Sequence, residues 1–346
     1  MGLTRSDTIL KCIVEYFIKN AQPVGSHTLI DEYHLPYSSA TIRNEMFALE
    51  KMGYIEKTHS SSGRVPSSKG YKYYCKHLRD GGIDEALKSS LQVVLEQKVR
   101  SVEEVIKESC EILSHMTNLV SVVTGSKDSI EKLANVQLVP IGDNTLTAIF
   151  ITDKGYVENK TFIVPANVKS EEIVECVKLL NDRLVGTPIN ELVDKMESLK
   201  PILNDYVVSH DIVYQALLQT FIRFAGDRLS LYGRDELFNQ PEFKNDAEKL
   251  QEVFKLLNDK NVFKEVSGEQ IDNKNKDVVV NIGETNPDVS MVTTKFKIGD
   301  GEESTITLLG PTRMDYDRVL SALEYITDEL NKYFDELNKG GNDGDA

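Results

Sequence analysis

The first 50 residues carry three helical patterns in quick succession, and this is the feature that most limits the possible folds. Apolar residues recur at helical spacing from Ser6 to Asn20, with Thr4 or Ser6 available as the N-cap. Pro23 and Gly25 interrupt the pattern, after which residues 26–33 form a second short helical pattern. A third pattern begins at Ser38 or Ser39 and continues to about Met52, where Gly53 ends it. The sequence therefore predicts three short helices.

A hairpin pattern follows the third helix. Residues 54–57 are strand-like, residues 59–66 form a polar loop that contains Gly63, and a tyrosine-rich helix begins after Ser67 or Ser68. Helix, helix, helix and a two-stranded hairpin is the order of elements in a winged helix-turn-helix module. We expect such a module over residues 1–80.

Charge is distributed unevenly along the chain. The formal net charge is -15, yet residues 1–80 carry 11 Lys and Arg against 8 Asp and Glu. The run from Lys57 to Arg79 holds six cations and no acid, which predicts a compact patch of charge +6. A basic module in an otherwise acidic protein indicates local contact with phosphates.

The third helix has an apolar stripe and an opposite face suited to DNA. A helical wheel places Ile42, Met46 and Leu49 on the inner stripe. The outward positions are Ala40, Arg43, Asn44, Phe47 and Lys51. Arg can bond guanine, Asn can bond adenine, and Ala can contact a thymine methyl group in the major groove. Ser38, Ser39 and Thr41 at the helix start suit phosphate oxygens. The alternative is a solvated helix face with ordinary N-caps.

The hairpin region supplies further candidates for DNA contact. A glycine at a hairpin tip lets the backbone approach the sugar-phosphate chain, and an adjacent Arg64 can enter a narrow minor groove. The candidates in this region are His59, Ser61, Gly63, Arg64, Lys69 and Lys72. A solvated basic turn is the alternative.

The rest of the chain is a mixture of helices and strands. Residues 84–115 predict one or two helices, strands follow between 119 and 164 and between 278 and 309, and a helix ends the fold at 314–338. Further helices are expected at 173–185, 189–199, 211–223 and 246–258. The sequence thus predicts an α+β multidomain protein.

Several classes of protein are disfavoured by the sequence. No stretch is apolar enough for a membrane span and no signal peptide is apparent, so we expect a cytoplasmic protein. The four cysteines are far apart, and neither the cysteines nor the six histidines show metal-ligand spacing. No nucleotide-binding or hydrolase motif occurs. We therefore expect no enzyme activity, metal or cofactor.

Motifs at both ends of the chain resemble one family. Pro23-Val24-Gly25-Ser26, the stretch 38–46, and the stretch 59–66 with Lys69-Gly70-Tyr71 closely resemble the DNA-binding domain of HrcA, the bacterial heat-inducible transcription repressor. The stretch 310–316, Gly-Pro-Thr-Arg-Met-Asp-Tyr, resembles that family's C-terminal signature. Ser62, Lys72 and Cys75 depart mildly from the family pattern.

The resemblance implies a domain plan and a function. It implies a winged helix at 1–80, linker helices and a GAF-like α/β domain at 81–134 and 241–338, and an inserted α+β dimerising domain at about 135–240, with 339–346 as a disordered tail. It also implies a homodimer that binds the double-stranded inverted-repeat CIRCE operator of chaperone operons, with the GroE chaperonin as modulator. GAF-like domains often hold small ligands, so a sensor pocket is the alternative for the C-terminal half. Arg313 and Asp315 either face such a ligand or form an ordinary helix cap and ion pair.

Overall fold

The computed structural model describes residues 2–58, 63–96, 102–125, 132–142, 145–153, 157–163, 170–206, 218, 229–244, 246–264, 269–273, 276–298 and 302–340. The chain divides into two compact units. The first comprises Met1–Lys127 and Leu229–Ala346, and the second comprises Asp128–Arg228. The prediction of an α+β protein is confirmed, with several antiparallel sheets among the described residues.

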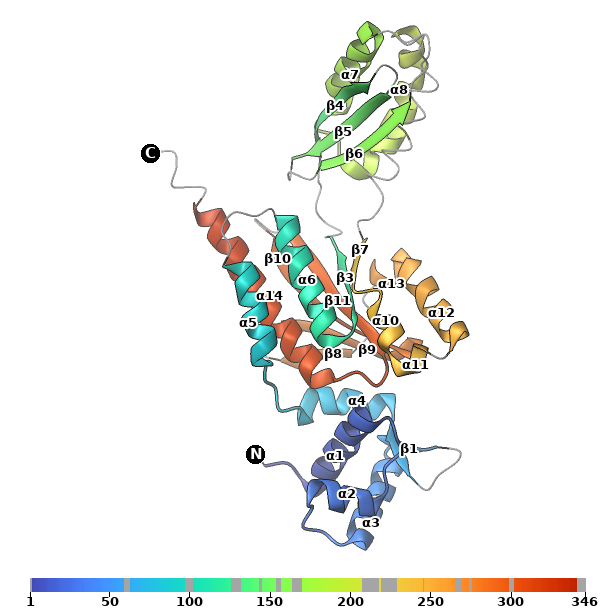
Figure 1. Ribbon diagram of the computed structural model, residues 1–346, viewed down its shortest axis with the longest axis vertical. Helices are drawn as coiled ribbons and strands as arrows, with labels where there is room; N and C mark the ends of the chain where they lie inside the picture. The colour runs from blue at the N-terminus through green and yellow to red at the C-terminus, as the bar shows by residue number, and fades with distance from the viewer. Residues whose placement is uncertain are drawn as a thin grey trace. The chain divides into compact units, whose positions relative to one another are not determined.

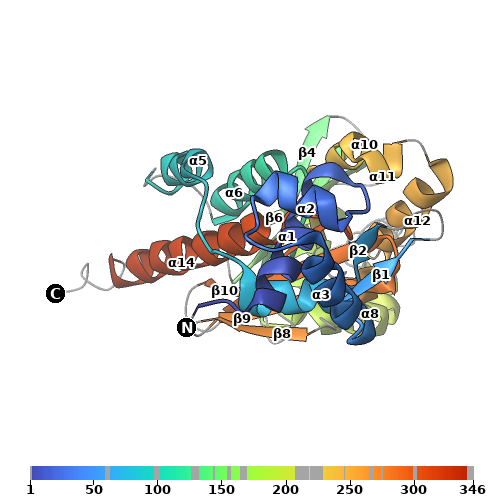
Figure 2. The same cartoon turned by 90° about the horizontal axis from the view of Figure 1, so that it is seen from below.

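The first unit begins with the predicted helices and hairpin. Its N-terminal elements are α1 (Arg5–Asn20), α2 (Ser26–Tyr33), α3 (Ser39–Lys51), β1 (Ile55–Lys57), β2 (Arg64–Pro66), α4 (Ser68–Tyr73) and the π-helical turn η1 (Tyr74–Leu78). Helix α1 starts with a capping box in which Thr4 accepts from the main-chain N–H of Asp7, and Asp7 accepts from that of Thr4. Figure 2 shows α3 beside the β1–β2 hairpin. Residues 2–78 are called the N-terminal segment below.

The larger part of the first unit is a sheet with helices on both faces. Its elements are α5 (Glu85–Leu95), α6 (Val102–Thr117), β3 (Val120–Thr124), β7 (Leu229–Tyr232), α10 (Glu236–Asn239), α11 (Pro241–Lys244), α12 (Ala247–Asn258), α13 (Lys260–Lys264), β8 (Glu269–Asn273), β9 (Lys276–Asn286), β10 (Val289–Ile298), β11 (Glu302–Pro311) and α14 (Tyr316–Gly340). Among the described strands the order is β7-β3-β11-β10-β9-β8, with every neighbour antiparallel.

The sheet has a hydrophobic core on each of its two faces. Apolar residues of α5, α6 and α14 pack on one face, while those of α10 to α13 pack on the other (Figure 1). The arrangement is consistent with a GAF-like domain. Strand β7 lies inside the range 135–240 expected for the insertion, but it pairs with β3 of the first unit.

The second unit is a smaller α+β structure. It contains β4 (Leu133–Gly142), β5 (Thr145–Thr152), β6 (Val157–Ile163), α7 (Ser170–Leu184), η2 (Ile189–Glu191) and α8 (Leu192–Tyr206). Helices α7 and α8 cover one face of the antiparallel β4-β5-β6 sheet. Asn181 of α7 bonds both main-chain groups of Val136, at 2.9 and 2.8 Å, and so fixes the helix on the sheet. Most of the helix expected at 211–223 and the tail after 340 lie outside the described residues.

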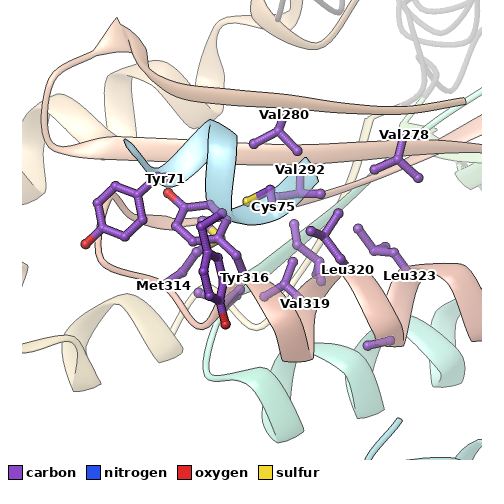
Figure 3. Close-up of a cluster of buried hydrophobic side chains, with 14 of the residues drawn as sticks. Tyr71, Cys75, Val278, Val280, Val292, Met314, Tyr316, Val319, Leu320 and Leu323 are labelled. Atoms are coloured by element: carbon purple, nitrogen blue, oxygen red, sulfur yellow. The ribbon is translucent and has the colours of Figure 1, made fainter. Parts of the chain in front are cut away.

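The N-terminal segment shares a core with the sheet. Tyr71 and Cys75 are buried against the residues of β9, β10 and α14 that Figure 3 labels, and the rings of Tyr71 and Tyr316 are 5.1 Å apart. The Tyr316 hydroxyl donates to Thr312 O at 2.7 Å and lies 2.9 Å from Ser290 Oγ. Helix α4 and the turn η1 therefore join the three-helix segment to the sheet through apolar contacts. No helix within the described ranges is both long and apolar enough to cross a membrane.

Candidate nucleic-acid interface

Helix α3 presents the face that its sequence pattern predicts. Ile42, Met46 and Leu49 are buried, which confirms the inner stripe. The exposed positions include Ala40, Arg43, Asn44, Phe47 and Lys51. These five side chains, which we call the α3 face, include two cations and no acid. They lie on one side of the helix because, apart from the adjacent pair Arg43 and Asn44, neighbouring positions in this set are three or four residues apart.

The start of α3 is held by hydroxyl groups. Ser38 is the N-cap, and its Oγ accepts from the main-chain N–H of Thr41 at 3.2 Å. Ser39 Oγ lies 2.9 Å from Ser26 Oγ and 3.3 Å from His27 Nε2, so it ties α3 to α2. Within the free protein these side chains therefore serve as caps and interhelical contacts. The exposed Ser38 hydroxyl lies beside the N–H groups of the first turn.

The aromatic member of the α3 face is accessible. Phe47 is 56% exposed, and the Lys51 ammonium lies 5.0 Å from the centre of its ring. This cation–π contact places a positive charge and a flat apolar surface together.

Glu45, a carboxylate of α3, is paired with the start of α1. Its Oε1 accepts from Arg5 Nε and its Oε2 from the Ser6 hydroxyl, both at 2.7 Å. These bonds stabilise the ionised form, so the hydrogen bonds from Ser6 and Arg5 lower the pKa of Glu45. No local sequence pattern predicts this pair, because Arg5 lies 40 residues from Glu45.

The position of Gly63 differs from the expected hairpin tip. Gly63 is buried, and a Cβ atom added there would lie 2.7 Å from Cβ of Pro23. A glycine is needed because the hairpin passes close to the α1–α2 connection. This packing accounts for the glycine within the fold, and the approach of its backbone to a sugar-phosphate chain stays a prediction. His59 and Ser61 lie outside the described residues.

Arg64 points back to the end of α3. Its Nε and Nη2 donate to Glu50 Oε2 at 2.9 and 2.7 Å, and its side chain is 12% exposed. Lys57 Nζ lies 3.7 Å from Glu50 Oε1. Arg64 therefore pairs with a carboxylate of the protein in this structure, in contrast to the predicted contact with a DNA groove.

The two lysines of α4 also have partners within the first unit. Lys69 Nζ donates to the carbonyl of Met52 at 2.8 Å and lies 4.7 Å from the centre of the Tyr54 ring. Lys72 forms an ion pair with Glu284 of β9. Lys69 therefore caps the C-terminal end of α3, where a cation is favoured, and remains exposed.

The expectation of a free +6 patch is wrong. Among the described residues, four of the six cations in the run 57–79 are paired with acidic residues from outside that run. Glu50 pairs with Lys57 and Arg64, Glu284 pairs with Lys72, and Glu324 and Asp317 pair with Arg79, whose side chain is only 6% exposed. The cationic groups of the α3 face, Arg43 and Lys51, come from a segment that the charge count did not emphasise.

Arg313 and Asp315 have structural contacts. Arg313 Nε donates to Glu242 Oε1 at 2.6 Å, and its Nη1 donates to the carbonyl of Ile18. Asp315 precedes α14, and its Oδ1 accepts from the main-chain N–H of Arg318 at 3.2 Å. Of the two alternatives for this loop, these contacts match the helix cap and ion pair.

The described residues offer little support for other chemistry. They contain no cluster of His, Cys, Asp and Glu that could hold a metal ion. All four cysteines are buried, and burial raises the pKa of Cys12 and Cys176 to about 11, which keeps these thiols protonated. A cavity of about 10 Å³ lies between α13 and the sheet, lined in part by Asn281, Thr293 and Thr307. That volume accommodates about one water molecule, and a metabolite needs far more space.

Comparisons with known proteins place the chain in a family. A crystal structure described as a hypothetical protein is 24% identical, with a TM-score of 0.64, and the match covers 97% of this chain and 99% of that chain. An IclR family transcriptional regulator from Brucella abortus is 9% identical over 96% of this chain and 92% of its own, with a TM-score of 0.22. The family described as HrcA protein C terminal domain matches residues 103–320, more than half of the sequence. The chain therefore belongs to the HrcA family of heat-inducible transcription repressors.

Proposed function

We propose that the N-terminal segment is a winged helix-turn-helix that places α3 in the major groove of DNA. The observation that carries this proposal is the composition of the α3 face, which joins Arg43, Asn44 and Lys51 without an acid. Glu50, the acid next to it, is held in ion pairs with Arg64 and Lys57, and Glu45, on the side of α3 that contacts α1, is paired with Arg5. An unpaired carboxylate there would repel the phosphates, so the pairing leaves a surface that a polyanion can approach.

The roles of the individual residues follow from groove chemistry. Arg43 bonds a guanine, Asn44 bonds an adenine, and Ala40 lies against a thymine methyl group. Ser38, Ser39 and Thr41 approach phosphate oxygens at the start of α3, and Lys69 adds a phosphate contact beside the hairpin. Lys72 would contact phosphate only after leaving Glu284. We also propose that His59 and Ser61 contact the DNA.

The DNA target is an inverted repeat bound by a homodimer. One N-terminal segment per chain contacts one half-site, so a palindromic operator requires two-fold symmetry in the protein. We assign dimerisation to the inserted domain, predicted at about 135–240, and the operator to the CIRCE type upstream of chaperone operons. The family supports a repressor that acts in the cytoplasm and is not an enzyme.

Titration of two duplexes tests this function. One duplex carries the CIRCE inverted repeat and the other carries the same bases in scrambled order, both at one fixed, moderate salt concentration. We expect the repeat to bind at least about 1,000-fold more tightly. Equal affinities would leave only nonspecific binding and would contradict the proposal.

We further propose that the GroE chaperonin maintains the active repressor. Operator affinity falls in proportion to the fraction of competent dimer, and heat lowers that fraction. A chaperonin that rescues unfolded chains would raise the active yield without binding the native state. The test is to heat the protein briefly, cool it, and measure operator binding with and without chaperonin and ATP. Full recovery without chaperonin, or no gain with it, would contradict this mechanism.

A further inference from the structure

Glu50 and Arg64 join helix α3 to the β1–β2 hairpin. Glu50 lies in the last turn of α3, and Arg64 is the first residue of β2. Two nitrogens of the guanidinium donate to one carboxylate oxygen, at 2.9 and 2.7 Å. The side chains of Arg64 and Glu50 are only 12% and 25% exposed, so solvent screens this pair less than an ordinary surface ion pair.

The backbone of Arg64 is bound to the α1–α2 connection. Its N–H donates to Val24 O and its carbonyl accepts from Val24 N, each at 2.9 Å. Gly63 packs closely against Pro23 on the same connection. The start of β2 is therefore attached to the α1–α2 connection by its main chain and to the end of α3 by the Arg64 side chain.

Glu50 lies next to the proposed DNA face. It follows Arg43 by seven residues, about two helical turns, and so lies on nearly the same side of α3. Without Arg64, this carboxylate would stand beside the positions that approach DNA. Together with Lys57, whose Nζ lies 3.7 Å from Glu50 Oε1, Arg64 neutralises Glu50, and its side chain links the start of β2 to the end of α3.

From these contacts we propose that Glu50 and Arg64 are a positioning pair for operator binding, and that Arg64 acts through Glu50 without contacting DNA. The inference rests on the proposed DNA-binding function of α3. It assigns the orientation of the hairpin to a side-chain pair and removes Arg64 from the residues that touch the operator.

A double-mutant cycle tests the pair. The variants are Arg64→Ala, Glu50→Ala and the double variant, with Lys295→Ala as a control that removes one cation from an exposed ion pair on β10. Operator and scrambled duplexes are titrated against each protein at several salt concentrations. Thermal melting checks that each variant is folded, and Arg64→Lys, which keeps the charge but loses the fork, replaces Arg64→Ala if that variant does not fold.

The positioning role predicts strong coupling between the two sites. Arg64→Ala should weaken operator binding about 10-fold in the wild-type background but less than about 2-fold in the Glu50→Ala background, because the partner is already gone. The dependence of affinity on salt should stay as in the wild type for Arg64→Ala, and Lys295→Ala should bind both duplexes like the wild type.

A direct contact between Arg64 and DNA predicts the opposite pattern. The loss from Arg64→Ala would then be at least as large in the Glu50→Ala background, and the salt slope would fall by about 0.9. Either result, or an Arg64→Ala variant that binds the operator like the wild type, would overturn the inference while leaving the DNA-binding function intact. A wild-type protein that does not distinguish the two duplexes would overturn both.

Discussion

The guanidinium of Arg313 donates a hydrogen bond to the main-chain carbonyl of Ile18, although the two residues are 295 positions apart. Ile18 lies in the last turn of α1, and Arg313 follows the last strand of the sheet. The same guanidinium bonds Glu242 of α11 at 2.6 Å. Arg313 therefore connects the first helix of the N-terminal segment to both the sheet and its covering helices.

Replacement of Arg313 should weaken this connection. Arg313→Ala leaves the Glu242 carboxylate and the Ile18 carbonyl without their shared donor, so we expect a loss of about 1–3 kcal/mol in the free energy of unfolding. Urea or thermal unfolding of the full chain measures it, with Lys332→Ala, an exposed ion-pair partner on α14, as the control. An unchanged midpoint for Arg313→Ala would show that the contact contributes nothing and would reopen a ligand-facing role for this loop.

Gly70 should not tolerate a side chain. A Cβ atom at Gly70 would lie 2.0 Å from the carbonyl oxygen of Tyr54, which is main chain and cannot move aside. We expect Gly70→Ala to destabilise the N-terminal segment by about 2–3 kcal/mol or to displace α4. The control is Gly82→Ala, where a Cβ atom meets nothing within 4 Å, and whose unfolding free energy should change by less than about 0.5 kcal/mol. Equal melting temperatures for the two variants would contradict the close approach of α4 to Tyr54.

The contacts of Glu45 with Arg5 and Ser6 should make the free energy of unfolding depend on pH. Hydrogen bonds from Ser6 and Arg5 hold the folded pKa of Glu45 below its ordinary value of 4.5. A lowered folded pKa contributes stability that is fully present above the unfolded pKa and is lost as pH falls through the folded pKa. Glu45→Gln should therefore lower stability by about 0.5–1 kcal/mol at pH 7. The difference between variant and wild type should shrink as the pH falls below 4.5.

Thermal melting of both proteins from pH 7 to pH 3 measures this effect. Ser6→Ala, which removes one of the two donors to Glu45, should give a smaller change with the same pH trend. A wild-type advantage that stayed constant across this range would contradict an ionised Glu45 as the source of the stability.

Local sequence patterns predicted well those helices that bury an apolar stripe. The stripe of Ile42, Met46 and Leu49 is buried as the wheel requires, and the second helix has the predicted ends, Ser26 and Tyr33. Short or polar elements were missed because they carry no periodicity. Strand β8, with the sequence Glu-Gln-Ile-Asp-Asn at the end of the sheet order, is one case, and the four-residue strand β7 is another.

The sequence predicted the exposed face of α3 but not the ion-pair partners of the basic run. The outward face of α3 follows from helical geometry alone, so Arg43 and Asn44 could be identified from the sequence. The partners of the basic run could not, since Glu50, Glu284 and Glu324 reach Arg64, Lys72 and Arg79 across 14, 212 and 245 positions. Such pairs depend on the complete fold, and a count of charges within a segment does not register them.

The α3 face is proposed to recognise bases. The most direct test is the ratio of operator to scrambled-duplex affinity for Arg43→Ala. We expect this variant to lose about 10- to 100-fold for the operator and little for the scrambled duplex, because the lost contact reads a base. Lys69→Ala, which removes a phosphate contact, should weaken both duplexes about equally. An Arg43→Ala protein that kept the wild-type ratio would contradict the claim that this face of α3 reads the operator.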